Sequence, residues 1–145
     1  MKVLVLNGPN LNMLGIRQPH IYGTTTYAQL EDLLQKHASS IGVELTIRQS
    51  NHEGTLVDWI QEARTVYDGI IINPAAYTHT SVALLDALEA VELPAVEVHI
   101  SDVTKREAFR QISYVRQACV NTIMGHGIAG YTEALSFLKE YCQTR

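Results

Sequence analysis

Short apolar segments rich in β-branched residues alternate along the chain with segments in which apolar residues recur every three or four positions. The first pattern predicts buried β-strands and the second predicts amphipathic helices. We expect strands at residues 2–7, 43–49, 69–73, 95–100 and 121–125. Strands that alternate with helices form βαβ units, so residues 1–145 are predicted to be a single α/β domain with helices on both faces of a parallel sheet.

Four helices are expected between and after these strands. A capping box formed by Thr26 and Gln29 marks the start of the first helix. The other helices are expected to start at Thr55, at Thr80 or Ser81, and at Tyr131. The residues expected to face inward are Leu30, Leu33, Leu34, His37, Ile41, Leu56, Trp59, Ile60, Ala63, Val82, Leu84, Leu85, Leu88, Leu135 and Leu138.

The strand order that suits five such units is 2-1-3-4-5, the doubly wound arrangement. In this order the first and third strands are neighbours, and the loops that follow them diverge to leave a crevice beyond their carboxyl ends. The fourth strand lies beside the third. The loops that follow the first, third and fourth strands should therefore surround any ligand.

Polar and ionisable residues concentrate in and around these three loops. They are Asn7, Asn10, Asn12, Arg17 and Tyr22 at the first strand, Asn73, Tyr77, His79 and Ser81 at the third, and Glu97, His99, Ser101, Arg106 and Arg110 at the fourth. This coincidence indicates a binding or catalytic site at the carboxyl edge of the sheet.

An arginine and a tyrosine stand five residues apart in the first of these loops. A free tyrosine has a pKa of about 10, so only about one in a thousand is phenolate at neutral pH. A neighbouring guanidinium stays protonated and stabilises the phenolate. Arg17 beside Tyr22 could thus make a strong base usable near neutrality, although both could equally be ordinary surface residues.

Glu97 and His99 are two residues apart on a strand, so their side chains point to the same face. Glu97 could orient the imidazole and favour its protonated form, and a core histidine satisfied by a carboxylate would show the same pattern. Arg106 and Arg110 could together hold a substrate carboxylate, or Arg110 could pair with Glu107 three positions before it. Asp86, on the third helix, reads by itself as a solvated carboxylate.

The segment GHGIAG, residues 125–130, matches the G-x-G-x-x-G fingerprint of dinucleotide-binding proteins. That fingerprint also requires a following strand and an acidic residue about 20 positions further on, and 15 residues follow Gly130 here. We therefore expect a glycine-rich turn that packs the last helix close to the sheet. Its amide groups could still help to bind an anion.

Composition narrows the class of protein further. The hydrophobic fraction of 46%, the charged fraction of 18% and the formal net charge of −4 are typical of a soluble globular protein, and nucleic acid and anionic membranes are poor candidates as partners. The first apolar run is too short for a signal peptide or a membrane span, so we expect a cytoplasmic protein. The histidines and cysteines show no metal-binding spacing, so we expect no metal and two free thiols, Cys119 and Cys142.

Several motifs taken together resemble the type II 3-dehydroquinate dehydratase family. In the order and spacing of that family, the chain contains NGPNLNMLGIRQPHIYG (7–23), QSNHEG (49–54), INPAAYTHTSVALLDAL (72–88), VEVHISD (96–102), REAFR (106–110) and GIAGY (127–131). The resemblance implies a flavodoxin-like fold and a hydro-lyase without cofactor or metal. The implied reaction is the reversible anti elimination of water from 3-dehydroquinate through an enolate, giving 3-dehydroshikimate in the shikimate pathway (chorismate and aromatic amino acid biosynthesis) or in quinate catabolism.

The resemblance also implies roles for individual residues. Tyr22 is the base that removes a proton from C2, and Arg17, on a loop that closes over the substrate, favours its ionised form. Asn12 positions a water that stabilises the enolate, and His99, backed by Glu97, protonates the departing hydroxyl group. The implied substrate contacts are Asn73, His79, Ile100, Ser101 and Arg110, together with Asp86, which reaches a neighbouring subunit's site in a dodecamer of four trimers.

Four residues, Gln18, Leu85, Asp102 and Thr104, differ from those common in the family, and none of them replaces an expected catalytic group.

Three alternative functions are open. A receiver domain would need an acidic cluster after the first strand, and an FMN-binding protein would be yellow. An imine-forming dehydratase would need a lysine in an apolar strand at the crevice, which none of Lys2, Lys36, Lys105 and Lys139 satisfies.

Overall fold

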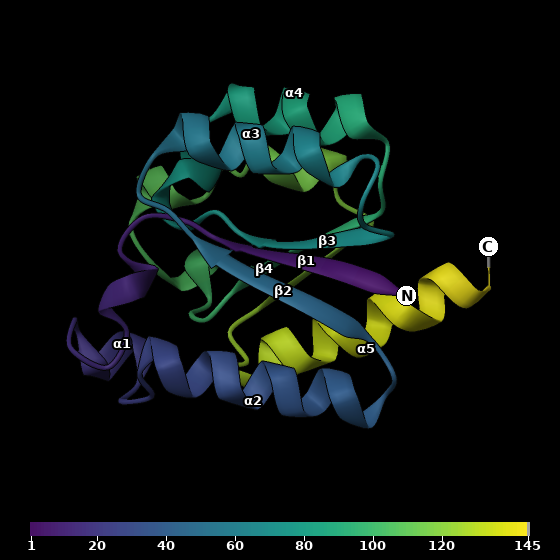
Figure 1. Ribbon diagram of the computed structural model, residues 1–145. Coiled ribbons are helices and arrows are strands. Elements are labelled where there is room, and N and C mark those ends of the chain that lie inside the picture. Colours follow the sequence, from purple (N-terminus) through teal and green to yellow (C-terminus); the bar gives the residue numbers. More distant parts are fainter. Residues whose placement is uncertain (145) are drawn as a thin grey trace.

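The computed structural model describes residues 1–144, which form a parallel sheet with helices on both faces (Figure 1). The strands are β1 (Lys2–Asn7), β2 (Glu44–Gln49), β3 (Gly69–Asn73), β4 (Ala95–His99) and β5 (Asn121–Met124). Their order is β2-β1-β3-β4-β5, and every neighbouring pair is parallel. The predicted doubly wound, flavodoxin-like arrangement is confirmed, and no expected strand end is more than one residue away from the observed end.

Two long helices cover each face of the sheet (Figure 1). On one face lie α2 (Tyr27–Ser40) and α5 (Ala129–Gln143), and on the other lie α3 (Glu53–Ala63) and α4 (Val82–Val91). The loops contain the short helices η1 (Leu11–Met13), α1 (Pro19–Tyr22), η2 (Ala75–His79), η3 (Val103–Lys105), η4 (Ala108–Arg110) and η5 (Val115–Ala118). Within residues 1–144, none of the helices has the length and apolar character that crossing a membrane requires.

Local signals explain where the helices begin. The capping box is present, because Thr26 Oγ1 accepts from the Gln29 amide at 3.2 Å and the Gln29 side chain accepts from the Thr26 amide at 2.9 Å. Ser81 caps α4 as predicted. The expected starts of α3 and α5 are each two residues late, since these helices begin at Glu53 and Ala129. An acidic residue in the first turn, as in α3, interacts favourably with the helix dipole.

The sheet divides the core into two apolar layers, because successive strand side chains point to opposite faces. The layer under α2 and α5 includes Val3, Val5, Ile71, Val96 and Val98, and the layer under α3 and α4 includes Leu4, Leu6, Ile70 and Ile72. Two residues expected to face inward do not: Leu33 is 44% and Val82 is 48% exposed. Each lies beside the stripe of its helix that contacts the sheet, so the prediction for these two was wrong.

The glycine-rich segment 125–130 joins β5 to α5. A Cβ on Gly130 would lie 3.4 Å from Ile123 Cγ2, so glycine allows the helix to approach the sheet closely. The amides of Gly125 and Gly127 donate to the carbonyl oxygens of His99 and Ile100, at 3.3 and 3.0 Å. The packing role is therefore confirmed, and these two amides are not available to bind an anion.

The crevice begins where β1 and β3 end side by side. The Gly8 amide donates to the Asn73 carbonyl oxygen at 2.8 Å, and a Cβ on Gly8 would lie only 2.4 Å from the Pro74 carbonyl oxygen. Only glycine fits such a close approach of two backbones. This contact brings the loop that carries Arg17 and Tyr22 against the loop that carries His79.

Candidate active site

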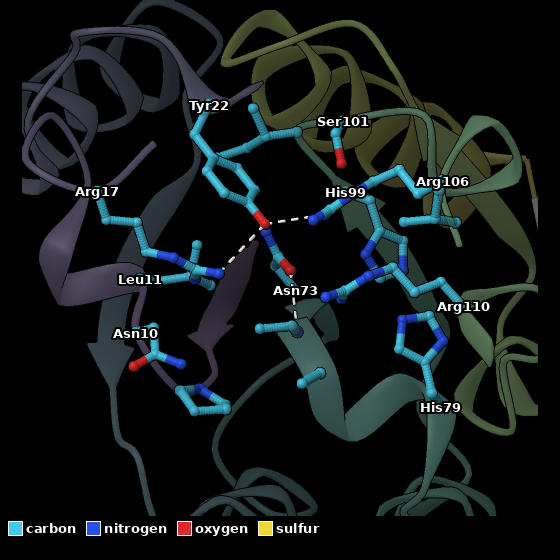
Figure 2. A pocket seen from close by; sticks show the side chains of 15 residues that line it. Asn10, Leu11, Arg17, Tyr22, Asn73, His79, His99, Ser101, Arg106 and Arg110 are labelled. Atoms are coloured by element: carbon cyan, nitrogen blue, oxygen red, sulfur yellow. Dashed lines mark hydrogen bonds between the residues drawn. The ribbon is translucent and has the colours of Figure 1, made fainter. Parts of the chain in front are cut away.

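A cavity of about 250 Å³ opens at the carboxyl edge of the sheet, between the loops that follow β1, β3 and β4 (Figure 2). This is where the strand order predicts a site. The expected site residues that line it are Arg17, Tyr22, Asn73, His79, His99, Ile100, Ser101 and Arg110. The expected residues outside its lining are Asn12, Asp86 and Glu97.

Arg17 lies two residues before the single turn of α1, and Tyr22 is the last residue of that turn. Gln18 takes a left-handed conformation with φ of 39°, Pro19 begins the turn, and the Tyr22 amide donates to the Gln18 carbonyl oxygen at 3.1 Å. This turn folds the chain back on itself. As a result Arg17 Nη2 lies 3.4 Å from Tyr22 Oη, and the guanidinium carbon lies 4.7 Å from the centre of the phenol ring.

A second arginine approaches the same phenol from the loop after β4. Arg106 Nη1 donates to Tyr22 Oη at 2.9 Å, so the phenol oxygen lies between two guanidinium groups (Figure 2). Sequence reasoning placed Arg106 at the crevice, with a carboxylate contact as one possibility, and missed this contact, because the two residues are 84 positions apart and only folding brings them together. Two guanidinium groups, which are always charged, therefore converge on the phenol oxygen.

Glu97 is fully buried behind His99, and its carboxylate is surrounded by donors. Oε2 lies 2.7 Å from His99 Nε2 and 2.6 Å from the hydroxyls of Thr78 and Ser113, while Oε1 accepts from Arg116 Nε at 3.1 Å and Thr122 Oγ1 at 3.0 Å. Burial by itself would raise the pKa of Glu97, but the hydrogen bond and charge of His99, with the Ser113 and Thr78 hydroxyls, hold it well below its ordinary range. The carboxylate is therefore ionised and sets the orientation of the imidazole.

His79 and Arg110 form the opposite wall of the cavity (Figure 2). His79 Nδ1 lies 2.7 Å from the Ile112 carbonyl oxygen and must donate to it, since a carbonyl only accepts. Burial lowers the pKa of His79, and the hydrogen bond to Ile112 acts in the opposite direction. In the neutral ring, Nε2 is then an acceptor. Arg110 Nε donates to Glu107 at 2.6 Å, which leaves the two terminal nitrogens of the guanidinium for other partners.

Asn12 and Asp86 lie outside the cavity of their own chain. Asn12 is exposed on η1, where its Oδ1 lies 3.5 Å from Gln49 Nε2. Asp86 is exposed on α4. The roles expected for Asn12 and Asp86 therefore stay predictions.

Among the described residues, the cavity wall includes no lysine, and no group of three or more His, Cys, Asp or Glu is placed to hold a metal ion.

Comparison with known proteins identifies the family. The sequence model of the family described as dehydroquinase class II matches residues 1–139. The chain belongs to the class II dehydroquinase family. It is therefore an enzyme of the hydro-lyase class, as the sequence motifs predicted, and neither a receiver domain nor an FMN-binding protein.

Relatives and solved structures agree with this class II dehydroquinase assignment. A "3-dehydroquinate dehydratase" from Dinoroseobacter shibae is 51% identical over 135 residues, which is 93% of this chain and 90% of the relative. A "catabolic 3-dehydroquinase 1" from Fusarium vanettenii is 54% identical over 93% of this chain and 94% of its own. The crystal structure of a type II dehydroquinase from Butyrivibrio crossotus has a TM-score of 0.94 at 48% identity, covering 96% of this chain and 97% of that one.

Proposed function

We propose that the chain catalyses the reversible anti elimination of water from 3-dehydroquinate, through an enolate, to give 3-dehydroshikimate. One observation carries the proposal: the phenol oxygen of Tyr22 lies between the guanidinium groups of Arg17 and Arg106 on the wall of the cavity. The same cavity contains His99 with an ionised carboxylate behind it. One relative is named a catabolic enzyme and the other is named by its reaction alone, and a reversible reaction serves either aromatic biosynthesis or quinate breakdown.

The first step needs a strong base, because a proton next to a ketone is only weakly acidic. In the proposed mechanism the Tyr22 phenolate takes the proton from C2, and the electron pair moves onto the ketone oxygen to form the enolate. Arg17 and Arg106 favour the phenolate that begins this step. A water held by Asn12 donates a hydrogen bond to the enolate oxygen.

The second step needs an acid, because hydroxide is a poor leaving group. His99 donates its proton to the C1 hydroxyl as the C–O bond breaks, so that water leaves and the electron pair of the enolate forms the new double bond. The ionised Glu97 accepts a hydrogen bond from Nε2 of the imidazole and holds the ring in place. The proton taken by Tyr22 returns to His99 through solvent, and the reverse reaction uses the same groups in opposite roles.

The remaining cavity residues match the polar groups of the substrate. The free terminal nitrogens of Arg110 are donors for its carboxylate, while the substrate hydroxyls have partners in His79, Asn73 and Ser101, with Ile100 packing beside them. Asp86 would complete the site of a neighbouring subunit in a cytoplasmic dodecamer built from trimers. Its exposed position on α4, away from the cavity of its own chain, supports such a role.

The proposed reaction is tested by adding 3-dehydroquinate to the purified protein in the presence of a chelator and following the near-ultraviolet absorbance of the enone product. The absorbance should rise at a rate proportional to enzyme concentration. A parallel sample treated with borohydride should show no added mass, since only an imine intermediate is trapped in this way. A covalent adduct, or no absorbance change, would contradict the proposal.

Replacing either arginine beside the phenol should move the pH dependence of the reaction. In Arg17→Met and Arg106→Met the phenol oxygen loses one neighbouring positive charge, so in the proposed mechanism the limb of the kcat profile that reports the base should move to higher pH. Profiles of kcat against pH from 5 to 10 measure this shift. Arg64→Met, at an exposed position, is the control, and an unmoved limb in both test variants would leave the two arginines only a role in binding.

A further inference from the structure

A chain of polar side chains crosses the interior beneath the cavity and joins three elements that are distant in sequence. Asn7 ends β1, Asn73 ends β3 and Tyr131 lies in the first turns of α5. Their exposed fractions are 0%, 3% and 0%. Asn73 Nδ2 donates to Tyr131 Oη at 2.8 Å, and Tyr131 Oη donates to Asn7 Oδ1 at 2.7 Å. Only Asn73 of these three reaches the cavity wall.

The directions of these hydrogen bonds follow from the groups themselves. A phenol has one proton, and burial raises the pKa of Tyr131, so the group stays protonated. Its proton goes to the carbonyl end of Asn7, and its oxygen must then accept from Asn73. At the other end of the amide, Asn73 Oδ1 accepts from the Ala75 amide at 3.1 Å. The amide of Asn73 is thus fixed at both ends and cannot flip.

We propose that Tyr131, supported by Asn7, is a positioning residue that fixes the Asn73 amide for recognition of a substrate hydroxyl group. Fixed in this way, Asn73 retains one N–H donor and one acceptor lone pair beyond its internal bonds. A donor beside an acceptor is the complement of a hydroxyl, which both donates and accepts. The proposal rests on the proposed function, because it assigns this amide to a hydroxyl of that substrate.

The first test is Tyr131→Phe, which removes only the oxygen that holds Asn73. A contact to a hydroxyl away from the reacting carbons is equally strong in the ground and transition states, so its loss raises KM and leaves kcat unchanged. We expect KM for 3-dehydroquinate to rise about tenfold, with kcat within about twofold of wild type. An unchanged KM would overturn the proposal. Tyr27→Phe is the matched control, since its hydroxyl contacts Asn7 Nδ2 at 3.4 Å, one step further from Asn73, and its KM should stay within about twofold.

A second pair of variants separates positioning from a loss of stability. Tyr131→Phe leaves Asn7 Oδ1 buried without a donor and Asn73 Nδ2 without its acceptor, which is destabilising, whereas replacing both partners of a hydrogen bond by apolar groups is nearly neutral. The double variant Asn7→Leu with Tyr131→Phe removes the first of these two losses, so it should recover part of the melting temperature lost in Tyr131→Phe while KM stays raised. Recovery of KM together with the melting temperature would show a structural role only and would overturn the proposal.

A double-mutant cycle shows whether Tyr131 acts through Asn73. In an Asn73→Ala background there is no amide to position, so adding Tyr131→Phe should change KM by less than about twofold. The same tenfold change in both backgrounds would contradict the proposal. These outcomes are distinct from failure of the proposed function, which would leave the wild-type protein itself without activity on 3-dehydroquinate.

Discussion

Tyr22→Phe is expected to lower kcat by about 10²–10⁴-fold while the substrate still binds. The substitution removes the one oxygen that lies between the two guanidinium groups and keeps the ring that lines the cavity. Loss of a general base typically has an effect of this size. The ring contributes to binding equally in the ground and transition states, so the affinity should change little.

The measurement combines steady-state kinetics with direct titration of substrate into the inactive variant. Tyr67→Phe is a suitable control, because Tyr67 lies just before β3 at the opposite edge of the sheet and should retain wild-type kcat. If Tyr22→Phe kept more than about a tenth of the wild-type kcat, the assignment of Tyr22 as the base would be wrong. If it no longer bound substrate, the loss of rate would say nothing specific about proton transfer.

The strands and the capping box could be predicted from sequence because their signals are local. A strand of a parallel sheet is covered on both faces, so GIIIN (69–73) reads as a continuous apolar run that ends in a polar residue at the crevice. Arg17 and Tyr22 are five positions apart, so a single turn suffices to bring them together. These features depend on few residues and on no distant part of the chain.

The partners that complete the site could not be predicted in this way. Arg106 meets Tyr22 across 84 positions, and Asn7 meets Tyr131 across 124. Nothing in the local sequence around Tyr131 distinguishes it from any other buried aromatic residue of a helix. Each pairing depends on how the ends of different elements converge at the carboxyl edge, so the strand order could predict the region of the site and not its hydrogen bonds.

Glu97 links His99 to the wall of the cavity that contains His79 and Arg110. Its Oε2 accepts hydrogen bonds from the hydroxyls of Thr78 and Ser113. Thr78 precedes His79 in the sequence, and Ser113 follows Ile112, whose carbonyl oxygen accepts from His79. The Tyr114 amide also donates to the Thr78 carbonyl oxygen at 2.9 Å. One buried carboxylate therefore ties the loop after β3 to the segment that follows Arg110. We infer that the charge of Glu97 stabilises the loops around the cavity as well as the orientation of His99.

Glu97→Gln should consequently have the largest effect on stability of any change considered for this molecule. Both carboxylate oxygens face donors, so whichever end becomes an NH2 group is placed against the N–H of Arg116 or of His99 and loses that hydrogen bond, the hydroxyls at that end must reverse their direction, and every remaining bond loses its charge. We expect a loss of about 2–4 kcal/mol in the free energy of unfolding, or roughly 10 °C in melting temperature. The exposed Glu62→Gln, which disrupts a surface pair with Arg48, should change stability by less than about 0.5 kcal/mol.

The pH dependence of this difference identifies its cause. Because the pKa of Glu97 in the folded protein lies below its ordinary value of 4.5, the unfolded chain takes up the proton first as the pH falls. The stabilisation is thus complete above pH 4.5 and is lost below it, by up to about 1.4 kcal/mol per pH unit. Urea unfolding of wild type and Glu97→Gln at intervals from pH 7 to pH 3 should show a constant difference down to about pH 5 and a shrinking one below. A difference that stayed constant to pH 3 would mean that the glutamine disturbs packing and that the ionised carboxylate contributes little.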